Sequence, residues 1–263
     1  MTPEKGDELR VSVVTVVKDA VNTIEDTLQS VASQSYPLIE HIVVDGGSVD
    51  GTLDIVHAYQ SVISKVISAP DNGIYDAMNK GIALARGDVV GMLNGDDVFA
   101  HDRVIARIAD VFHDPATQAC YADLVYMDAA LQRVVRYWQS APYRPGAFHA
   151  GWIPAHPTFY VRREVYAQHG VFDLEYRLQA DFEMALRLLA IHAVHSVYVP
   201  QIWVKMRIGG ATNRSLKNIV RGSLESYWAC RRHGLDVSAL FFVRKFLSRL
   251  PQFVRRPDRS AWQ

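Results

Sequence analysis

The sequence predicts an α/β fold built on a mostly parallel central sheet with helices on both faces. Residues 11–17, Val-Ser-Val-Val-Thr-Val-Val, are β-branched and almost wholly apolar, which is typical of a central parallel strand buried on both faces. Strand-like and helix-like segments then alternate as far as Leu93, and this alternation is the pattern of a doubly wound sheet. A polar loop follows each of the first four predicted strands.

The elements of the first half follow from the spacing of apolar residues. Ile24, Leu28 and Val31 recur at helical intervals, with Thr23 or Asn22 as the N-cap. The other predicted elements of this half are strands over 41–45, 62–67 and 88–93 and helices over 53–59 and 74–85.

The second half predicts a smaller region of mixed strand direction. Strands are expected over 120–126 and 133–138, joined by a turn near Asp128. A polar and aromatic loop over 149–157 leads into another short strand, and a helix begins near Asp181.

Composition excludes several classes of protein. Lys and Arg total 28, and Asp and Glu also total 28, so no global charge points to nucleic acid as a partner. Cys120 and Cys230 lack metal-ligand spacing, which predicts two reduced thiols, no disulfide framework and no zinc site. The polar first ten residues do not resemble a secretory signal, and no uninterrupted apolar stretch reaches about 18 residues. We therefore expect a cytoplasmic protein.

Carboxylates gather at the ends of four predicted strands. Parallel strands end at one edge of a sheet, so Asp19, Asp45, Asp71, Asp96 and Asp97 are expected to converge on one crevice. A surface pair is the simpler interpretation of Asp96 and Asp97 taken alone. A nucleoside diphosphate bridged by Mg²⁺ or Mn²⁺ fits the whole set, because the cation neutralises phosphates and carboxylates together.

Two other nucleotide-binding classes lack their motifs in this chain. The loop after the first strand has no Gly-x-Gly-x-x-Gly, and no P-loop Gly-Lys-Ser/Thr occurs, which argues against a nicotinamide dehydrogenase. The Gly-rich, Arg-containing first loop of a sugar nucleotidyltransferase is also missing after Val17.

Four motifs in order resemble the family 2 glycosyltransferases of bacterial polysaccharide biosynthesis. The resemblance covers roughly residues 10–190 and implies a GT-A, Rossmann-like fold and inverting transfer of a sugar from a nucleotide donor. The motifs are Val-Ser-Val-Val-Thr-Val-Val (11–17), Asp-Gly-Gly-Ser-Val-Asp-Gly-Thr (45–52), Asp-Asn-Gly-Ile-Tyr-Asp-Ala-Met-Asn-Lys-Gly (71–81) and Asn-Gly-Asp-Asp (94–97). The implied organisation is a polar arm (1–10), a nucleotide-sugar-binding half (11–115), an acceptor and catalytic-base half (116–237) and a basic amphipathic tail (238–263).

The resemblance also implies roles for the strand-end residues. Asn94-Gly95-Asp96 takes the place of the family's Asp-x-Asp, so Asp96 is the expected ligand of Mn²⁺ or Mg²⁺ and Asp97 supports the donor sugar. Gly46 replaces the second acid of the family's Asp-Asp-x-Ser loop, which leaves Asp45 as the contact to base or ribose. The expected donor-binding set is Thr15, Asp19, Asp45, Asp71, Asn94, Asp96 and Asp97.

The same resemblance places the catalytic base in the second half. Gln179-Ala180-Asp181 is similar to the family's Glu-Asp motif with its first carboxylate lost, so Asp181 is the expected base. Inverting transfer needs a base for the acceptor hydroxyl and an electrophile for the departing diphosphate. The helix start favours a charged Asp181, and is equally consistent with a plain cap. Asp123 and Asp173 are alternatives that no helix start orients.

Three further residues are candidates for binding the acceptor or a phosphate. His156 either binds one of these ligands or is simply packed, and Trp152 either stacks on a sugar ring or packs in the core. Arg207 begins the loop 207–214, which either closes over the diphosphate or is a plain turn.

The tail predicts an amphipathic helix over 240–254. Its apolar side is expected to hold Phe242, Val243, Phe246, Leu247 and Leu250, with Arg244, Lys245 and Arg249 opposite. Such a helix either lies on an anionic membrane surface or is the last core helix of the domain.

We therefore expect a metal-dependent inverting glycosyltransferase with a UDP-sugar as donor and a saccharide or lipid-linked saccharide as acceptor. Peripheral contact with the inner face of the plasma membrane is part of this expectation. The rival hypothesis is a catalytically silent subunit that binds a nucleotide sugar, which the carboxylates lost at Gly46, Asn94 and Ala180 favour.

Overall fold

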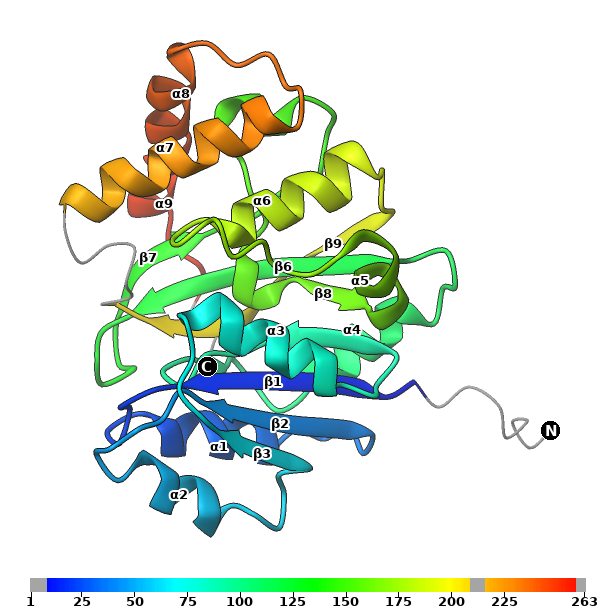
Figure 1. The fold of residues 1–263 in the computed structure, drawn as a ribbon, viewed down its shortest axis with the longest axis vertical. Coiled ribbons are helices and arrows are strands. Elements are labelled where there is room, and N and C mark those ends of the chain that lie inside the picture. The colour runs from blue at the N-terminus through cyan, green and yellow to red at the C-terminus, as the bar shows by residue number, and fades with distance from the viewer. Residues whose placement is uncertain (1–8, 209–215, 259–263) are drawn as a thin grey trace.

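The computed structural model describes residues 9–208 and 216–258, and nine strands within these ranges form one sheet (Figure 1). The first half alternates strands and helices as the sequence predicts. Its elements are β1 (Val11–Val17), α1 (Ile24–Ala32), β2 (Ile39–Asp45), α2 (Thr52–Ala58), β3 (Lys65–Ser68), α3 (Ile74–Leu84) and β4 (Val89–Met92).

The second half adds the mixed strands and the helices that extend the molecule beyond them. Helices α7 and α8 lie beyond α6, at the end of the molecule opposite β2 and β3 (Figure 1). The elements are β5 (Val98–Phe99), α4 (Val104–Phe112), β6 (Ala119–Met127), β7 (Val134–Trp138), η1 (Ala147–Ala150), η2 (His156–Thr158), β8 (Tyr160–Arg162), α5 (Arg163–His169), α6 (Ala180–Leu186), η3 (Arg187–Ile191), β9 (Ser196–Arg207), α7 (Leu216–Arg232), α8 (Leu240–Arg249) and α9 (Pro251–Val254).

The sheet has a parallel part and a mixed part. Its strand order is β3-β2-β1-β4-β8-β6-β9-β5, with β7 paired to β6. Strands β1 to β4 are parallel, whereas β8 is antiparallel to both β4 and β6. Val17, Asp45 and Ser68 are in register at the ends of β1, β2 and β3, so the loops after these strands leave the same edge.

Alternate side chains of β1 pack on opposite faces of the sheet. Val14 and Val16 belong to a core that contains residues of α3, α5 and α6, whereas Val11 and Val13 belong to one that contains residues of α1 and α4. This follows from the two-residue period of a strand. Each fully buried valine stabilises the fold by roughly 1.5–3 kcal/mol, so the apolar run fixes β1 at the centre of the sheet.

The longest strand, β9, was not predicted. Pro200 interrupts its pattern, and a proline cannot donate a hydrogen bond to a neighbouring strand. The structure accommodates Pro200 at a register shift between β6 and β9, where Tyr198 pairs with Tyr121 but Ile202 pairs with Asp123. Helices α4 and α5 were also missing from the prediction.

The tail corrects the predicted orientation of its helix. Lys245 was expected on the exposed basic side, yet its side chain is buried and its Nζ donates to Gln179 Oε1 at 3.2 Å. Phe246, from the predicted apolar side, is 66% exposed. Phe241 and Lys245, one turn apart, form the packed side of α8. The described ranges contain no helix that combines the length and apolar character needed to cross a bilayer.

Candidate active site

A cavity of about 1280 Å³ is lined by residues from both halves of the chain. Asp19, Asp71 and Asp96 line it from the loops after β1, β3 and β4, and His156 and Asp181 line it from the second half. Small-molecule pockets usually measure roughly 300–1,000 Å³, so this cavity has room for more than one substrate. Three of the five carboxylates expected at the crevice therefore reach it.

Asp19 joins two loops at the cavity wall. Its φ of 48° lies in the left-handed region, which side chains other than glycine seldom adopt. Its Oδ1 accepts a 2.9 Å hydrogen bond from the Val49 N–H, and its own N–H donates to Ser48 Oγ at 2.8 Å. Backbone strain of this kind is concentrated at functional sites.

Asp71 accounts for the glycine at position 46. A Cβ atom added to Gly46 would collide with the carboxylate of Asp71. Asp71 Oδ1 also accepts a 2.9 Å hydrogen bond from the Gly73 N–H, which helps to fix the carboxylate. The carboxylate of Asp71 therefore occupies the space beside Gly46.

Asp96 and Asp97 are separated by burial. Asp96 lines the cavity, whereas Asp97 is completely buried below it, with Oδ2 accepting a 3.3 Å hydrogen bond from Asn94 Nδ2. Burial first, and the charge of Asp96 second, raise the pKa of Asp97 well above its usual value. Asp97 does not line the cavity, so it does not reach a donor sugar as expected.

The residues at this position fit a divalent cation of the Mg²⁺ or Mn²⁺ type. Asn94 Oδ1 and Asp97 Oδ1 are buried and accept no hydrogen bond from the described residues. Carboxylate and amide oxygens suit these hard cations, which bind through one or two carboxylates and complete their shell with substrate phosphates and water. Such a site needs no larger cluster of ligands. Within 9–208 and 216–258, no group of three or more His, Cys, Asp or Glu residues is placed to hold a metal ion.

Thr15 and Asp45, two expected donor contacts, do not line the cavity. Thr15 is buried within the sheet, where its Oγ1 lies 3.0 Å from His41 Nε2. Asp45 accepts hydrogen bonds from Ser68 Oγ at 2.6 Å and from the Ser48 N–H at 3.1 Å. Burial alone would raise the pKa of Asp45, but the hydrogen bonds from Ser48, Ser68 and the Gly47 N–H outweigh burial and lower it. Asp45 therefore shapes the loop after β2.

Asp181 lies between two polar side chains at the cavity wall. Its Oδ1 accepts a 3.1 Å hydrogen bond from the hydroxyl of Tyr75 on α3, and its Oδ2 lies 3.4 Å from His156 Nδ1. The Asp181 side chain is 14% exposed, so it keeps access to the cavity. Burial lowers the pKa of His156, and the charge of Asp181 opposes that shift. This arrangement suits a carboxylate that accepts a proton from a bound hydroxyl group.

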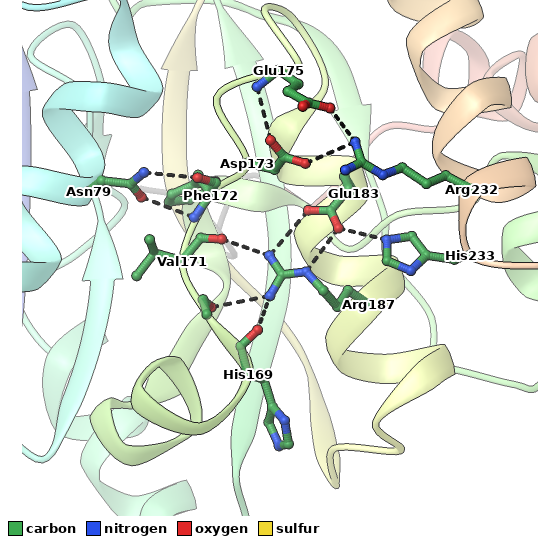
Figure 2. Close-up of polar contacts among 11 residues, drawn as sticks. Asn79, His169, Val171, Phe172, Asp173, Glu175, Glu183, Arg187, Arg232 and His233 are labelled. Carbon is green, nitrogen blue, oxygen red and sulfur yellow. Dashed lines mark hydrogen bonds and ion pairs between the residues drawn. The ribbon is translucent and has the colours of Figure 1, made fainter.

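Ion pairs behind the cavity hold the loop that precedes Asp181. Figure 2 shows Arg187 between the carboxylate of Glu183 and backbone carbonyls of this loop, with Nε at 2.9 Å from Glu183 Oε1 and Nη2 at 2.7 Å from the Val171 carbonyl. His233 Nε2 lies 2.7 Å from the same Glu183 oxygen. Asn79 on α3 bonds both backbone groups of Phe172 (Figure 2). The Asn79 bonds join this loop to α3 in the first half of the chain.

The alternative bases are held elsewhere. Asp123 is buried in β6 and accepts hydrogen bonds from Tyr137, Tyr198 and the Ser140 N–H. Asp173 accepts a hydrogen bond from the Glu175 N–H. Neither residue lines the cavity.

Trp152 and Arg207 differ from their expected roles. Trp152 does not line the cavity and packs edge-on against Tyr121 and Phe148. Arg207 does line it, but its guanidinium group pairs with Asp26 and donates to the Asp96 carbonyl at 2.7 Å. It therefore supports the backbone of Asp96, and its contacts leave little capacity for a phosphate. Residues 209–214 of the expected closing loop lie outside the described residues.

A basic and aromatic group on the cavity wall is not predicted by the sequence. Arg136 and Trp138 of β7, Arg249 of α8 and Phe253 of α9 all line it. The Arg136 guanidinium lies 4.8 Å from the Tyr126 ring centroid and 5.0 Å from that of Phe253. The spacing of Arg136 and Trp138 could have indicated this group. The two residues are two positions apart on a predicted strand, so their side chains lie on the same face of the sheet.

Comparisons with known proteins identify related sequences and folds. The model of the family described as Glycosyl transferase family 2 matches residues 12–151. A PGL/p-HBAD biosynthesis glycosyltransferase of Mycobacterium tuberculosis is 29% identical over 197 residues, covering 71% of this chain and 72% of the relative.

Two solved structures share the fold. TarS 1–349 of S. aureus, in complex with UDP-GlcNAc, superposes with a TM-score of 0.67 at 16% identity and covers 91% of this chain and 73% of that chain. The chain spans 44% of the longer TarS structure. The mannosyltransferase PcManGT of Pyrobaculum calidifontis, in complex with GDP-Man and Mn²⁺, superposes with a TM-score of 0.66 at 18% identity. The match covers 95% of this chain and 74% of PcManGT. These likenesses confirm the predicted GT-A fold class.

Proposed function

Because the chain belongs to glycosyl transferase family 2, we propose that it is a metal-dependent inverting enzyme that extends a surface polysaccharide. The proposed donor is a UDP-sugar, and the proposed acceptor is the hydroxyl group of a saccharide or lipid-linked saccharide. TarS in complex with UDP-GlcNAc supports the choice of nucleotide.

One observation carries the proposal. A single cavity holds Asp96 at the end of β4 and Asp181 at the start of α6. Inverting transfer places the base and the leaving group on opposite sides of the sugar ring, and the reactants gain from being held in that geometry. The two acids come from different halves of the chain, so they reach the cavity from separate elements.

The proposed base is Asp181. Tyr75 and His156 contact one carboxylate oxygen each, so the side chain is oriented before an acceptor binds. In the proposed step, Asp181 takes the hydroxyl proton as the acceptor oxygen attacks the anomeric carbon and the bond to the nucleoside diphosphate breaks.

The proposed holders of the cation are Asp96 and Asn94. A divalent cation at this position supplies positive charge to the departing diphosphate when it is bound. Arg207 donates to the carbonyl of Asp96, and Thr23 Oγ1 donates to that of Gly95 at 2.9 Å. These bonds keep the loop after β4 in place.

The exposed face of α8 supports membrane contact as part of the proposal. Val243 and Leu247 are more than half exposed beside Phe246, and the exposed Arg244 and Arg255 give this region positive charge. Apolar and basic residues together favour anionic bilayers. Phe246→Glu should reduce sedimentation with phosphatidylglycerol vesicles, whereas Val62→Glu, far from the tail in sequence, should not. Equal sedimentation of Phe246→Glu and wild type would contradict membrane contact through α8.

A nucleotide panel tests the donor. UDP, GDP and dTDP sugars with Mn²⁺ should raise the melting temperature in proportion to the logarithm of ligand excess over Kd, with the UDP-sugar giving the largest shift. Asp96→Ala should abolish the Mn²⁺-dependent part of the shift. Equal shifts with and without Mn²⁺ would contradict metal dependence.

The catalytically silent alternative retains one argument, because Asn94 stands where the family carries an acid. Release of UDP from a UDP-sugar, measured without acceptor over hours, separates the two proposals. Binding without any release supports the silent subunit, whereas Mn²⁺-dependent release supports the enzyme.

A further inference from the structure

Two arginines and two aromatic side chains from β7, α8 and α9 line the cavity together with its acidic residues. They are Arg136, Trp138, Arg249 and Phe253, and Asp181 lies in the same cavity. The charge of Arg249 acts on Arg136, and the charge of Asp181 acts on Arg249. Both guanidinium groups therefore line the cavity that also holds the proposed base.

Arg136 is held rigidly without a carboxylate partner. Its guanidinium carbon lies 4.8 Å from the Tyr126 ring centroid and 5.0 Å from that of Phe253, and its Nε, at 2.7 Å, and its Nη2 both donate to Gln252 Oε1. Gln252 is an uncharged amide, so the charge of Arg136 is not neutralised by these bonds. Stacking leaves the rest of the planar group available for a ligand.

The guanidinium group of Arg249 has fewer hydrogen-bond partners than that of Arg136. It makes no hydrogen bond or ion pair with any residue of the ranges 9–208 and 216–258. Burial first lowers the pKa of both arginines, yet arginine remains charged at neutral pH. Both side chains are only half-buried, so a ligand in the cavity can reach them, and an anion bound between them would supply the hydrogen-bond acceptors that Arg249 lacks among the described residues.

We infer that Arg249 and Arg136 form a subsite for a phosphate group of the acceptor. This inference rests on the proposed function, because it assigns the acceptor end of the same site. Guanidinium groups bind phosphate oxygens in pairs. The phosphate belongs either to a lipid carrier or to a soluble glycan, and Phe246 and Leu250, which are exposed on α8 near Arg249, provide an apolar path for a lipid.

Titration calorimetry in metal-free buffer tests the subsite, because the donor end then lacks a cation and repels anions. The probes are inorganic pyrophosphate, geranyl diphosphate and geraniol. We expect both diphosphates to bind to wild type, and Arg249→Gln to weaken them by about tenfold or more, as expected for charge-assisted hydrogen bonds. Arg249→Lys should retain part of the affinity. Arg133→Gln, an exposed residue outside the cavity, is the matched control.

The outcomes separate the sources of phosphate. Tighter binding of geranyl diphosphate than of pyrophosphate assigns the subsite to a lipid carrier, whereas equal affinity assigns it to a soluble phosphate. No binding to wild type, equal binding by Arg249→Gln, or binding of geraniol as tight as that of geranyl diphosphate overturns the inference.

UDP binding with Mn²⁺ distinguishes this inference from the proposed function. It should be equal in wild type and Arg249→Gln. An equal loss of UDP and diphosphate binding in the variant would instead place Arg249 in the donor site and overturn the acceptor subsite. If wild type bound no UDP at all, the proposed function would fail first.

Discussion

The hydroxyl group of Tyr75 on α3 donates a 3.1 Å hydrogen bond to Oδ1 of Asp181 on α6. This contact joins residues 106 positions apart in the sequence. It connects the first half of the chain to the half that supplies the proposed base. Burial first, and the charge of Asp181 second, raise the pKa of Tyr75 well above its usual value, so the phenol stays protonated and remains a donor.

Tyr75→Phe tests whether this hydrogen bond orients the base. The rate constant for UDP release should fall by about tenfold, because a hydrogen bond to a charged group contributes about 1.5–3 kcal/mol, while the Kd for UDP stays unchanged. Tyr59→Phe is the matched control, since Tyr59 bonds Glu25 at 3.4 Å outside the cavity. A rate equal to that of wild type would show that Asp181 needs no such partner.

Gly46→Asp tests whether the Asp71 carboxylate leaves room for a second acid at position 46. Restoring the family's acid should weaken UDP binding, because the new Cβ collides with the Asp71 carboxylate. Adding Asp71→Gly to the first variant should recover part of the lost affinity, which calorimetry can measure. If Gly46→Asp alone bound UDP more tightly, the two acids would have to occupy separate places.

The buried side chain of His41 should make the folded protein less stable in acid. Burial lowers its pKa from 6.5 to about 4, so between these values the unfolded chain binds a proton that the folded chain does not. Stability is therefore lost as pH falls through this range, by about 2 kcal/mol between pH 7.5 and pH 5. In urea unfolding, the decrease in the free energy of unfolding from about pH 7.5 to about pH 5 should be smaller by this amount for His41→Gln than for wild type. An equal fall in both proteins would mean that His41 is protonated in the folded state.

The sequence predicted the parallel half of the fold well, because its signals are local. An apolar β-branched run and a polar loop at its end identify a strand and its carboxyl end without tertiary information. Strand β9 was missed because Pro200 breaks the pattern, and only pairing with a shifted register on β6 accommodates it.

The candidate site could be predicted only in part. Strand ends place residues at an edge but do not fix the direction of a side chain, so Asp19, Asp71 and Asp96 reach the cavity while Asp45 and Asp97 do not. Whether a tail residue such as Lys245 is buried or exposed depends on which side of α8 packs against α6 and α7. Arg249 reaches the cavity through the same packing, and neither arrangement has a local signal.

The rate of Mn²⁺-dependent UDP release by Asp181→Asn tests the central claim most directly. General-base catalysis contributes about 10²–10⁴ in rate, so the account predicts a loss of at least about a hundredfold with the Kd for UDP unchanged. A variant that released UDP within a few-fold of the wild-type rate would contradict the assignment of Asp181 as the base.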